Sequence, residues 1–247
     1  TAQSAPIRTA LEKMGFRKGA LPLPWPEPPV YQAPFVPQGI RVDGFLKDWP
    51  PDRAILMNSE EHKDFGEFEK PEDLGASVRF AWDNAYLYFV AKVTDNDVIA
   101  KRTGKNIWRD DLLEIYVDPE GDGLIWNDPR DYQLGFSPGH DGRELAAWSW
   151  FQGGEDPRGQ KRVLAEGYTD EKGYIIEGAI PWDFLGVTPG PGKEIRLSPA
   201  VHEIDRKRGE GKLVWFFRNE EGYQRFVLGK VLLVQKKEAR DVNTPKR

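Results

Sequence analysis

Between residues 78 and 234 the chain is a succession of short strand-like segments, each bounded by turn residues. The run 86–93 (YLYFVAKV) is the richest in β-branched and aromatic residues, and Asp83-Asn84 before it and residues 94–97 (TDND) after it are turn signals. About ten segments of this kind follow one another with few helical patterns. The sequence therefore predicts an all-β fold, a β-sandwich of two antiparallel sheets.

The segment 112–118 (LLEIYVD) shows the clearest division into two faces. Its alternation predicts that Leu113, Ile115 and Val117 face a core and that Glu114 and Tyr116 lie on the other side. Trp108 stands just before this strand. An aromatic ring beside a carboxylate suits a sugar, whose apolar face stacks while its hydroxyls are hydrogen-bonded. The alternative is that Trp108 and Glu114 only pack.

Composition excludes several classes of function. A net charge of −5 and a pI near 5.4 argue against nucleic-acid binding. The absence of cysteine excludes disulfides, a thiolate nucleophile and a cysteine zinc site. No apolar run approaches the length of a membrane span. With apolar residues at 39%, the chain can still bury a sizeable core.

Three regions follow from the distribution of proline and charge. Residues 1–38 hold a possible short helix and a proline-rich stretch, which we expect to be a linker or a strap over the domain. Residues 39–235 form the sandwich, and the charged tail 236–247 is expected to fray. The first residues do not read as a signal peptide. We expect one to have been removed, which gives an extracellular, periplasmic or cell-surface location.

Six segments, in this order, resemble the motifs of the family nine carbohydrate-binding modules. They are residues 40–49 (IRVDG with the later DW), 78–88 (VRFAWDNAYLY), 93–95 (VTD), 108–118 (WRDDLLEIYVD), 173–182 (GYIIEGAIPW) and 228–233 (LGKVLL). The resemblance implies an immunoglobulin-like or jelly-roll sandwich of the DOMON-like type. It also implies non-catalytic binding of a polysaccharide or oligosaccharide, as part of a larger carbohydrate-active protein.

In this family the sugar ring lies between two tryptophans. By position, the resemblance makes Trp108 the first aromatic plate and Glu114 the strand carboxylate. The second plate falls in residues 218–225, where Tyr223 is the only aromatic residue. Asp110 and Arg218 are further candidates for ligand binding. Three other tryptophans, Trp126, Trp148 and Trp150, lie outside the family pattern. Trp148 and Trp150 are two apart on one strand, so they share a face and either extend a sugar platform or pack.

The family resemblance also implies calcium. Asp118 and Asp122 are candidate ligands, because alternating oxygens in a tight turn can point at one centre. The turn lacks the glutamate of a calcium loop, so a plain acidic turn is the alternative. Asp95 and Asp97 are further possible oxygen donors.

Three other functions remain open. Asp110, Asp111 and Glu114 together with Glu177 could form the acid pair of a glycoside hydrolase. A module that has kept the fold and lost the sugar site could bind protein partners, and the missing second tryptophan favours this possibility. A haem site would have to draw on Met14, Met57, histidine or lysine.

Overall fold

The computed structural model describes residues 27–51, 53–66, 73–126, 128–151, 154–159, 162–206, 209–219 and 225–235. Several features predicted from the sequence lie outside these ranges. They are the possible helix over residues 7–18, the residue Trp25 in the proline-rich stretch, Tyr223 and the tail 236–247. The elements are β1 (Val30–Pro34), β2 (Ile55–Met57), η1 (Glu60–His62), β3 (Lys63–Phe65), β4 (Leu74–Trp82), β5 (Tyr86–Asp95), η2 (Gly104–Arg109), β6 (Leu112–Asp118), β7 (Leu124–Ile125), β8 (Tyr132–Ser137), β9 (Ala146–Ser149), β10 (Leu164–Asp170), β11 (Gly173–Pro181), α2 (Trp182–Leu185), β12 (Glu194–Asp205), β13 (Gly209–Val214), β14 (Phe217–Asn219), β15 (Arg225–Leu228) and β16 (Lys230–Val234).

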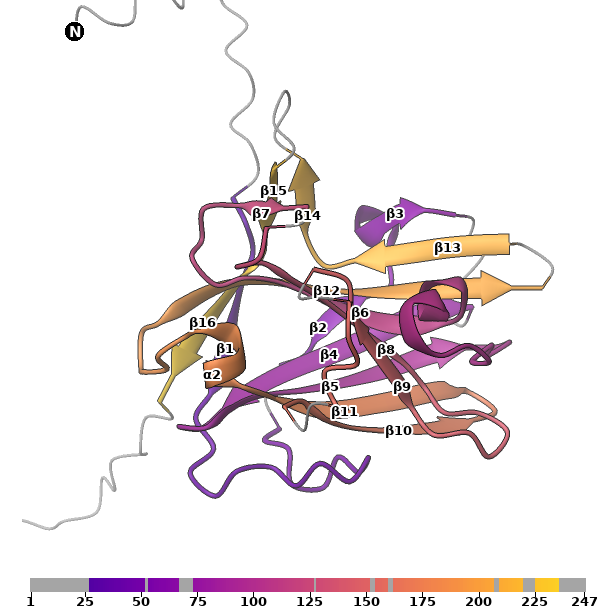
Figure 1. The fold of residues 1–247 in the computed structure, drawn as a ribbon, viewed down its shortest axis with the longest axis horizontal. Helices are drawn as coiled ribbons and strands as arrows, with labels where there is room; N and C mark the ends of the chain where they lie inside the picture. The colour runs from indigo at the N-terminus through magenta and orange to yellow at the C-terminus, as the bar shows by residue number, and fades with distance from the viewer. Residues whose placement is uncertain are drawn as a thin grey trace, which may run out of the picture.

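These strands form a β-sandwich, as the sequence predicts (Figure 1). The larger sheet has the order β1-β16-β12-β6-β8-β9, with β13 and β3 continuing from β12. The facing sheet has the order β10-β11-β5-β4-β2. A third, small sheet, β14-β15-β7, lies on the side of the larger sheet away from the five-stranded one (Figure 1). No helix in the described ranges is long and apolar enough to cross a bilayer.

The core lies between the two main sheets and is built from the apolar side of each strand. Leu113, Ile115 and Val117 of β6 are in it, which confirms the face predicted for them. They pack with the alternate residues of the facing strands, such as Phe89 of β5 and Ile176 of β11. All seven residues of β6 are buried, so its other face is covered as well.

The chain joins the sandwich before residue 39. β1 pairs in parallel with β16, a pairing that the sequence analysis did not predict. Tyr31 is buried with its ring edge against Phe80, and Phe35 packs on Trp82. These contacts make residues 30–35 part of the sandwich, and the strap or linker formed by the residues before them stays a prediction.

Buried Glu177 of β11 explains why two of the family-like motifs occur together. Its Oε2 accepts hydrogen bonds from the backbone N–H groups of Asp43 and Gly44, each at 2.7 Å. Its Oε1 accepts one from Trp49 Nε1 at 2.6 Å. Gly44 has a φ of +77°, which glycine adopts without strain. One carboxylate thus ties the Asp-Gly turn and the following tryptophan to the five-stranded sheet.

Candidate functional site

The candidate site is built on the outer face of the larger sheet, around Glu114 in the middle of β6. Its register partners are Gly135 on β8 and Ala200 on β12. Paired residues of antiparallel strands share a face, and both of these are small. Because Gly135 and Ala200 are small, they leave space beside Glu114 for side chains of other residues on this face of the sheet.

A polar network fills that room. Lys212 Nζ lies 2.5 Å from Glu114 Oε2 and donates to Tyr116 Oη at 2.7 Å. Tyr116 Oη donates to Glu114 Oε2 at 3.0 Å, and Gln133 Nε2 donates to Glu114 Oε1 at 2.8 Å. The four side chains come from three strands, β6, β8 and β13, so the network depends on the sheet for its geometry.

Charge inside the network is fixed by the ion pair. Burial by itself raises the pKa of Glu114, but the charge of Lys212 and the hydrogen bonds from Lys212 and Gln133 outweigh it, and the pKa is lowered. Burial and the charge of Glu114 raise the pKa of Tyr116. Glu114 is therefore an anion, Lys212 a cation and Tyr116 a neutral hydroxyl at neutral pH.

Tryptophans flank the network on the β9 side. The Trp150 ring lies over Gly135, so close that a Cβ on this glycine would be 2.5 Å from two of its carbons. Trp148 is the register partner of Gly135 and packs with Trp150 against Ile107 and Leu112. Both tryptophans pack, and both remain partly exposed beside the network.

Trp108 lies in η2, which packs against β8 and β9, and 44% of its surface is exposed. The guanidinium carbon of Arg109 lies 4.9 Å from the centroid of its ring. One face of Trp108 therefore makes a cation–π contact. Its role in ligand binding stays a prediction.

Asp110 holds the loop that carries Trp108. Its carboxylate is completely buried and accepts hydrogen bonds from the backbone N–H of Lys101 at 2.6 Å and of Arg102 at 2.5 Å. It also forms an ion pair with the Arg102 guanidinium. The sequence made Asp110 a candidate for ligand binding. With no exposed surface it is better described as a residue that positions the loop.

A second aromatic group lies on the β7 side of the network. Trp126, 39% exposed, has its ring edge-to-face with Tyr116, Phe151 and Phe226, at centroid distances of 6.4, 5.1 and 5.6 Å. Phe226 in turn stacks on Phe217 at 4.5 Å. Trp126 therefore lies beside the strands that lead into and out of the segment containing Tyr223.

Two predicted ligand-binding residues are not placed near Glu114. Tyr223 lies outside the described residues. Arg218 is a partly exposed residue of β14, one position after Phe217, which packs on Tyr116. Adjacent strand residues point to opposite faces, so Arg218 is on the face turned away from Tyr116. Its role in binding stays a prediction.

The turn at Asp118 is closed by hydrogen bonds to the carboxylate of this residue. Asp118 Oδ1 accepts from Gly121 N at 2.7 Å, and Oδ2 accepts from Gly123 N at 2.8 Å. Asp122 is half exposed and lies 4.0 Å from Arg130 Nη2. This geometry is that of an acidic turn, and calcium binding by Asp118 and Asp122 stays a prediction.

The acid pair of a glycoside hydrolase is not formed with Glu177. Glu177 belongs to the five-stranded sheet, and its side chain binds the turn at residues 43–44. Glu114 is on the outer face of the other sheet. The two carboxylates therefore lie on opposite sides of the sandwich, where they cannot flank one glycosidic bond.

Sequence reasoning missed Lys212, Gln133 and Trp126 as parts of the site. Lys212 stands just before the apolar pair Leu213-Val214, and the sequence analysis gave it no role. A lysine next to an apolar run was the available signal, since a buried lysine requires a charged partner.

Comparison with known proteins agrees with this fold. The model of the family described as "Carbohydrate family 9 binding domain-like" matches residues 56–236. Among curated relatives, endo-1,4-beta-xylanase A of Thermoanaerobacterium saccharolyticum is 28% identical over 143 residues, 57% of this chain and 11% of that protein. Endo-1,4-beta-xylanase A of Thermotoga maritima is 30% identical over 135 residues, 53% of this chain and 11% of that protein. The chain spans only about a tenth of the length of these relatives.

Solved structures show the same fold at low sequence identity. A carbohydrate binding module of family 9 from Caldicellulosiruptor kristjanssonii, in complex with cellotriose, has a TM-score of 0.63 and 17% identity. The alignment covers 88% of this chain and 99% of that one. The module in complex with glucose gives a TM-score of 0.61 over 87% of this chain and all of that chain, again at 17% identity. Since the family model also matches well over half of the sequence, this chain belongs to the carbohydrate family 9 binding domain-like family.

Proposed function

We propose that this chain binds carbohydrate without catalysis, on the outer face of the larger sheet. The observation that carries the proposal is the network of Glu114, Lys212, Gln133 and Tyr116, flanked by exposed aromatic rings. Family membership supports carbohydrate binding as the function, and the family 9 structures with cellotriose and glucose have the same fold. A glucan or xylan oligosaccharide is the ligand class that these relatives favour.

The network suits hydroxyl groups because it leaves donors and acceptors in fixed directions. The Lys212 ammonium has three N–H bonds, and only two are used by Glu114 and Tyr116. The Gln133 amide donates through one nitrogen and keeps its carbonyl oxygen as an acceptor. Glu114 is only 4% exposed, so its main role in the proposal is to hold these two side chains in place.

The aromatic rings supply the stacking surface. Trp108 offers the face that Arg109 does not cover. For the second plate, Trp126 is a candidate besides Tyr223, because it is exposed and contacts Tyr116, a member of the network. In this proposal, stacking on the rings provides most of the binding free energy. Hydrogen bonds from the sugar hydroxyls to the protein only replace hydrogen bonds to water, so their net contribution is small.

We further propose that the chain acts as an accessory module of a larger extracellular, periplasmic or cell-surface enzyme. The two curated relatives described above are xylanases, and the part that this chain resembles is only about a tenth of each. Catalysis in such proteins is expected to lie outside that part. The polymeric substrates of xylanases lie outside the cell, and this supports the proposed location.

The test is a binding screen of the full chain against soluble and insoluble glucans and xylans and their oligosaccharides, with product analysis of each mixture. Binding to at least one of these carbohydrates without release of new reducing ends is the expected result. Absence of binding to every carbohydrate would favour a module that binds protein partners. New reducing ends would make the chain an enzyme.

A further inference from the structure

The surface around Trp108 is basic, although the chain as a whole is acidic. Residues 101–109 (KRTGKNIWR) contain four cationic residues and no acidic one. All four are exposed: Lys101, Arg102, Lys105 and Arg109. Trp108, in the same segment, is 44% exposed. The segment therefore presents an aromatic ring among positive charges.

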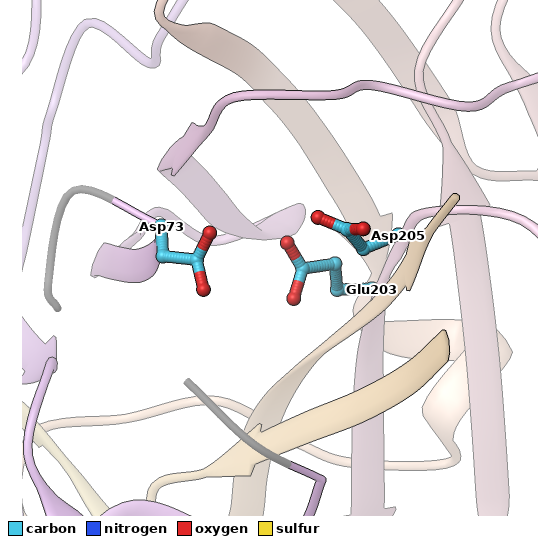
Figure 2. Close-up of side chains that lie close together, drawn as sticks. All are labelled: Asp73, Glu203 and Asp205. Carbon is cyan, nitrogen blue, oxygen red and sulfur yellow. The ribbon is translucent and has the colours of Figure 1, made fainter. Parts of the chain in front are cut away.

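The net charge of −5 does not describe this surface, because many of the acidic residues are buried. Asp73, Glu203 and Asp205 are an example. One carboxylate oxygen of each lies within 4.8 Å of the others, and Figure 2 shows the three groups close together. Side chains buried in this way are not part of the exposed surface around η2, and the sign of that surface depends on its own residues.

Of the four cations in residues 101–109, Arg102 has an acidic partner. Its guanidinium pairs with buried Asp110 and also donates to the carbonyl oxygen of Arg109 at 2.9 Å. Among the described residues, Lys101, Lys105 and Arg109 form no ion pair. The segment is thus held in place by Asp110, and three positive charges remain for solvent or a ligand.

The 3-10 geometry of η2 brings two of these charges to Trp108. Such a helix has about three residues per turn, so side chains three positions apart lie on one row. Lys105 therefore precedes Trp108 on the same row. The guanidinium carbon of Arg109 lies 4.9 Å from the centroid of the Trp108 ring. A ligand at Trp108 would lie next to both cations.

A groove beside η2 adds a further cation. It has a volume of about 590 Å³ and is lined by the start of η2, at Thr103 and Gly104, and by β9. Arg143 lines it as well, is exposed, and donates through Nη1 to the carbonyl oxygen of Lys101 at 2.5 Å. A guanidinium has five N–H donors, so most of those of Arg143 remain for a ligand.

The groove also contains two acidic side chains. Asp156 pairs with Arg158 at 3.4 Å, and Glu144 is an exposed neighbour of Arg143 in the sequence. Residues 101–110 and the groove together hold six cationic residues against three acidic ones. The surface therefore keeps an excess of positive charge after its own acids are counted.

The groove lies next to the tryptophans of the proposed carbohydrate face. Gly104 lines the groove, and a Cβ on this glycine would be 3.7 Å from a carbon of the Trp148 ring. Trp148 packs with Trp150, which lies over Gly135 beside the network. A sugar on that face and a charged group at η2 or in the groove can therefore belong to one ligand.

We propose that the carbohydrate bound by this chain carries uronic acid residues, whose carboxylates bind Lys105, Arg109 and Arg143. The inference rests on the carbohydrate binding proposed above and names its ligand class. A uronic acid combines a pyranose ring, which can stack on Trp108, with a carboxylate at the edge of that ring. Guanidinium groups match carboxylates in a bidentate geometry, and a lysine adds a point charge. A neutral glucan or xylan has no group that uses these charges.

The test compares acidic oligosaccharides with their own neutral forms. The full chain is titrated by calorimetry at pH 7 with a xylo-oligosaccharide substituted with glucuronic acid, with an oligogalacturonate, and with each of them after its carboxyl groups are reduced to alcohols. At about 20 mM NaCl we expect at least one acidic form to bind at least about fivefold tighter than its reduced form, as two or three exposed ion pairs would provide. At about 500 mM NaCl most of this preference should disappear, because exposed charges are screened.

Variants assign the preference to the named cations. Lys105→Gln and Arg143→Gln should each lower the ratio of the two affinities by about two- to threefold, while Arg143→Lys, which keeps the charge, should retain most of it. Lys92→Gln is the matched control, because exposed Lys92 of β5 lies on the outer face of the five-stranded sheet, beside core residue Val93. It removes the same charge from the other side of the sandwich and should keep the ratio. The Tm of each variant shows whether it is folded.

Three results would overturn the proposal. They are no preference for the acidic form in either pair, a preference unchanged in both Lys105→Gln and Arg143→Gln, and a preference lowered as much by Lys92→Gln. The reduced forms and the neutral carbohydrates of the screen test the proposed function separately. Equal binding of acidic and reduced forms would leave carbohydrate binding in place and remove only the charge preference.

Discussion

Lys212 and Glu114 form a buried ion pair on the outer face of the larger sheet, with the lysine nitrogen 2.5 Å from the carboxylate. The same nitrogen reaches Tyr116, and Gln133 binds the other carboxylate oxygen. A buried pair of this kind is weak evidence for stability, because desolvation offsets most of the attraction. Its value to the protein is more readily explained by the fixed directions in which it holds polar groups.

Removing the lysine should destabilise the fold. Lys212→Met leaves Glu114 buried without its cation, and breaking a buried pair from one side typically costs about 3–5 kcal/mol. Chemical denaturation at neutral pH measures the loss. Lys47→Met, at an exposed lysine that pairs only at the surface with Asp43, is the control and should change stability by less than about 1 kcal/mol. Equal, small effects in both variants would contradict the buried network.

Glu114 should make stability depend on pH in a defined direction. Its pKa is lowered in the folded state, so its contribution is complete above the ordinary value of 4.5 and is lost as pH falls through the folded pKa. The stability difference between wild type and Glu114→Gln should therefore be constant from pH 7 to about 5 and shrink below about 4.5. Denaturation curves across this range test it, and a difference that grows on acidification would refute the assignment.

Gly135 should tolerate no side chain. In Gly135→Ala the new Cβ meets the Trp150 ring at 2.5 Å, so the ring must move away from the network. We expect a loss of about 1–3 kcal/mol from overpacking, and weaker carbohydrate binding. Gly190→Ala is the matched control, because a Cβ there has no neighbour within 4 Å and φ is not positive. If the two substitutions behave alike, Trp150 does not occupy the place described.

The sandwich fold, and which side chains of a strand face its core, could be predicted from the sequence. The alternation of apolar and polar residues that shows this depends only on strand geometry. Leu113, Ile115 and Val117 face the core as expected. The parallel pairing of β1 with β16 could not be predicted, since it joins segments about 200 residues apart with no local signal. The third small sheet was missed for a similar reason, because β7 has only two residues.

The candidate site was predicted only along one strand. Trp108 and Glu114 were proposed because they are near each other in the sequence, and their role in binding stays a prediction. Their partners Lys212 and Gln133 come from other strands, and only the sheet register brings them to Glu114. Asp110 was assigned to ligand binding from its place beside Trp108, but its burial shows that it holds the loop.

The buried carboxyl group of Asp111 should make the fold less stable in alkali. Burial, and after it the charge of Asp95, raises the pKa of Asp111 above its ordinary value of 3.8, so its neutral form is favoured in the folded state. That contribution is complete below about 3.8 and is lost as pH rises through the folded pKa. Two groups near Asp111, Asp95 and Tyr174, are also acidic.

Thermal unfolding should therefore show Tm falling from pH 5 to pH 9. A Tm that is flat across this range would show that Asp111 is not held in its neutral form in the folded state.

The account of the binding face depends most directly on Trp108, an exposed ring with Arg109 over one face. Calorimetric titration of wild type and Trp108→Ala with cellotriose, or with whichever oligosaccharide the screen selects, measures its contribution. Phe45→Ala is the matched control, since Phe45 is an exposed ring with Lys47 at 5.9 Å. We predict that Trp108→Ala loses at least about tenfold in affinity with little change in Tm, while Phe45→Ala binds like wild type. Unchanged affinity in Trp108→Ala would contradict the proposed site.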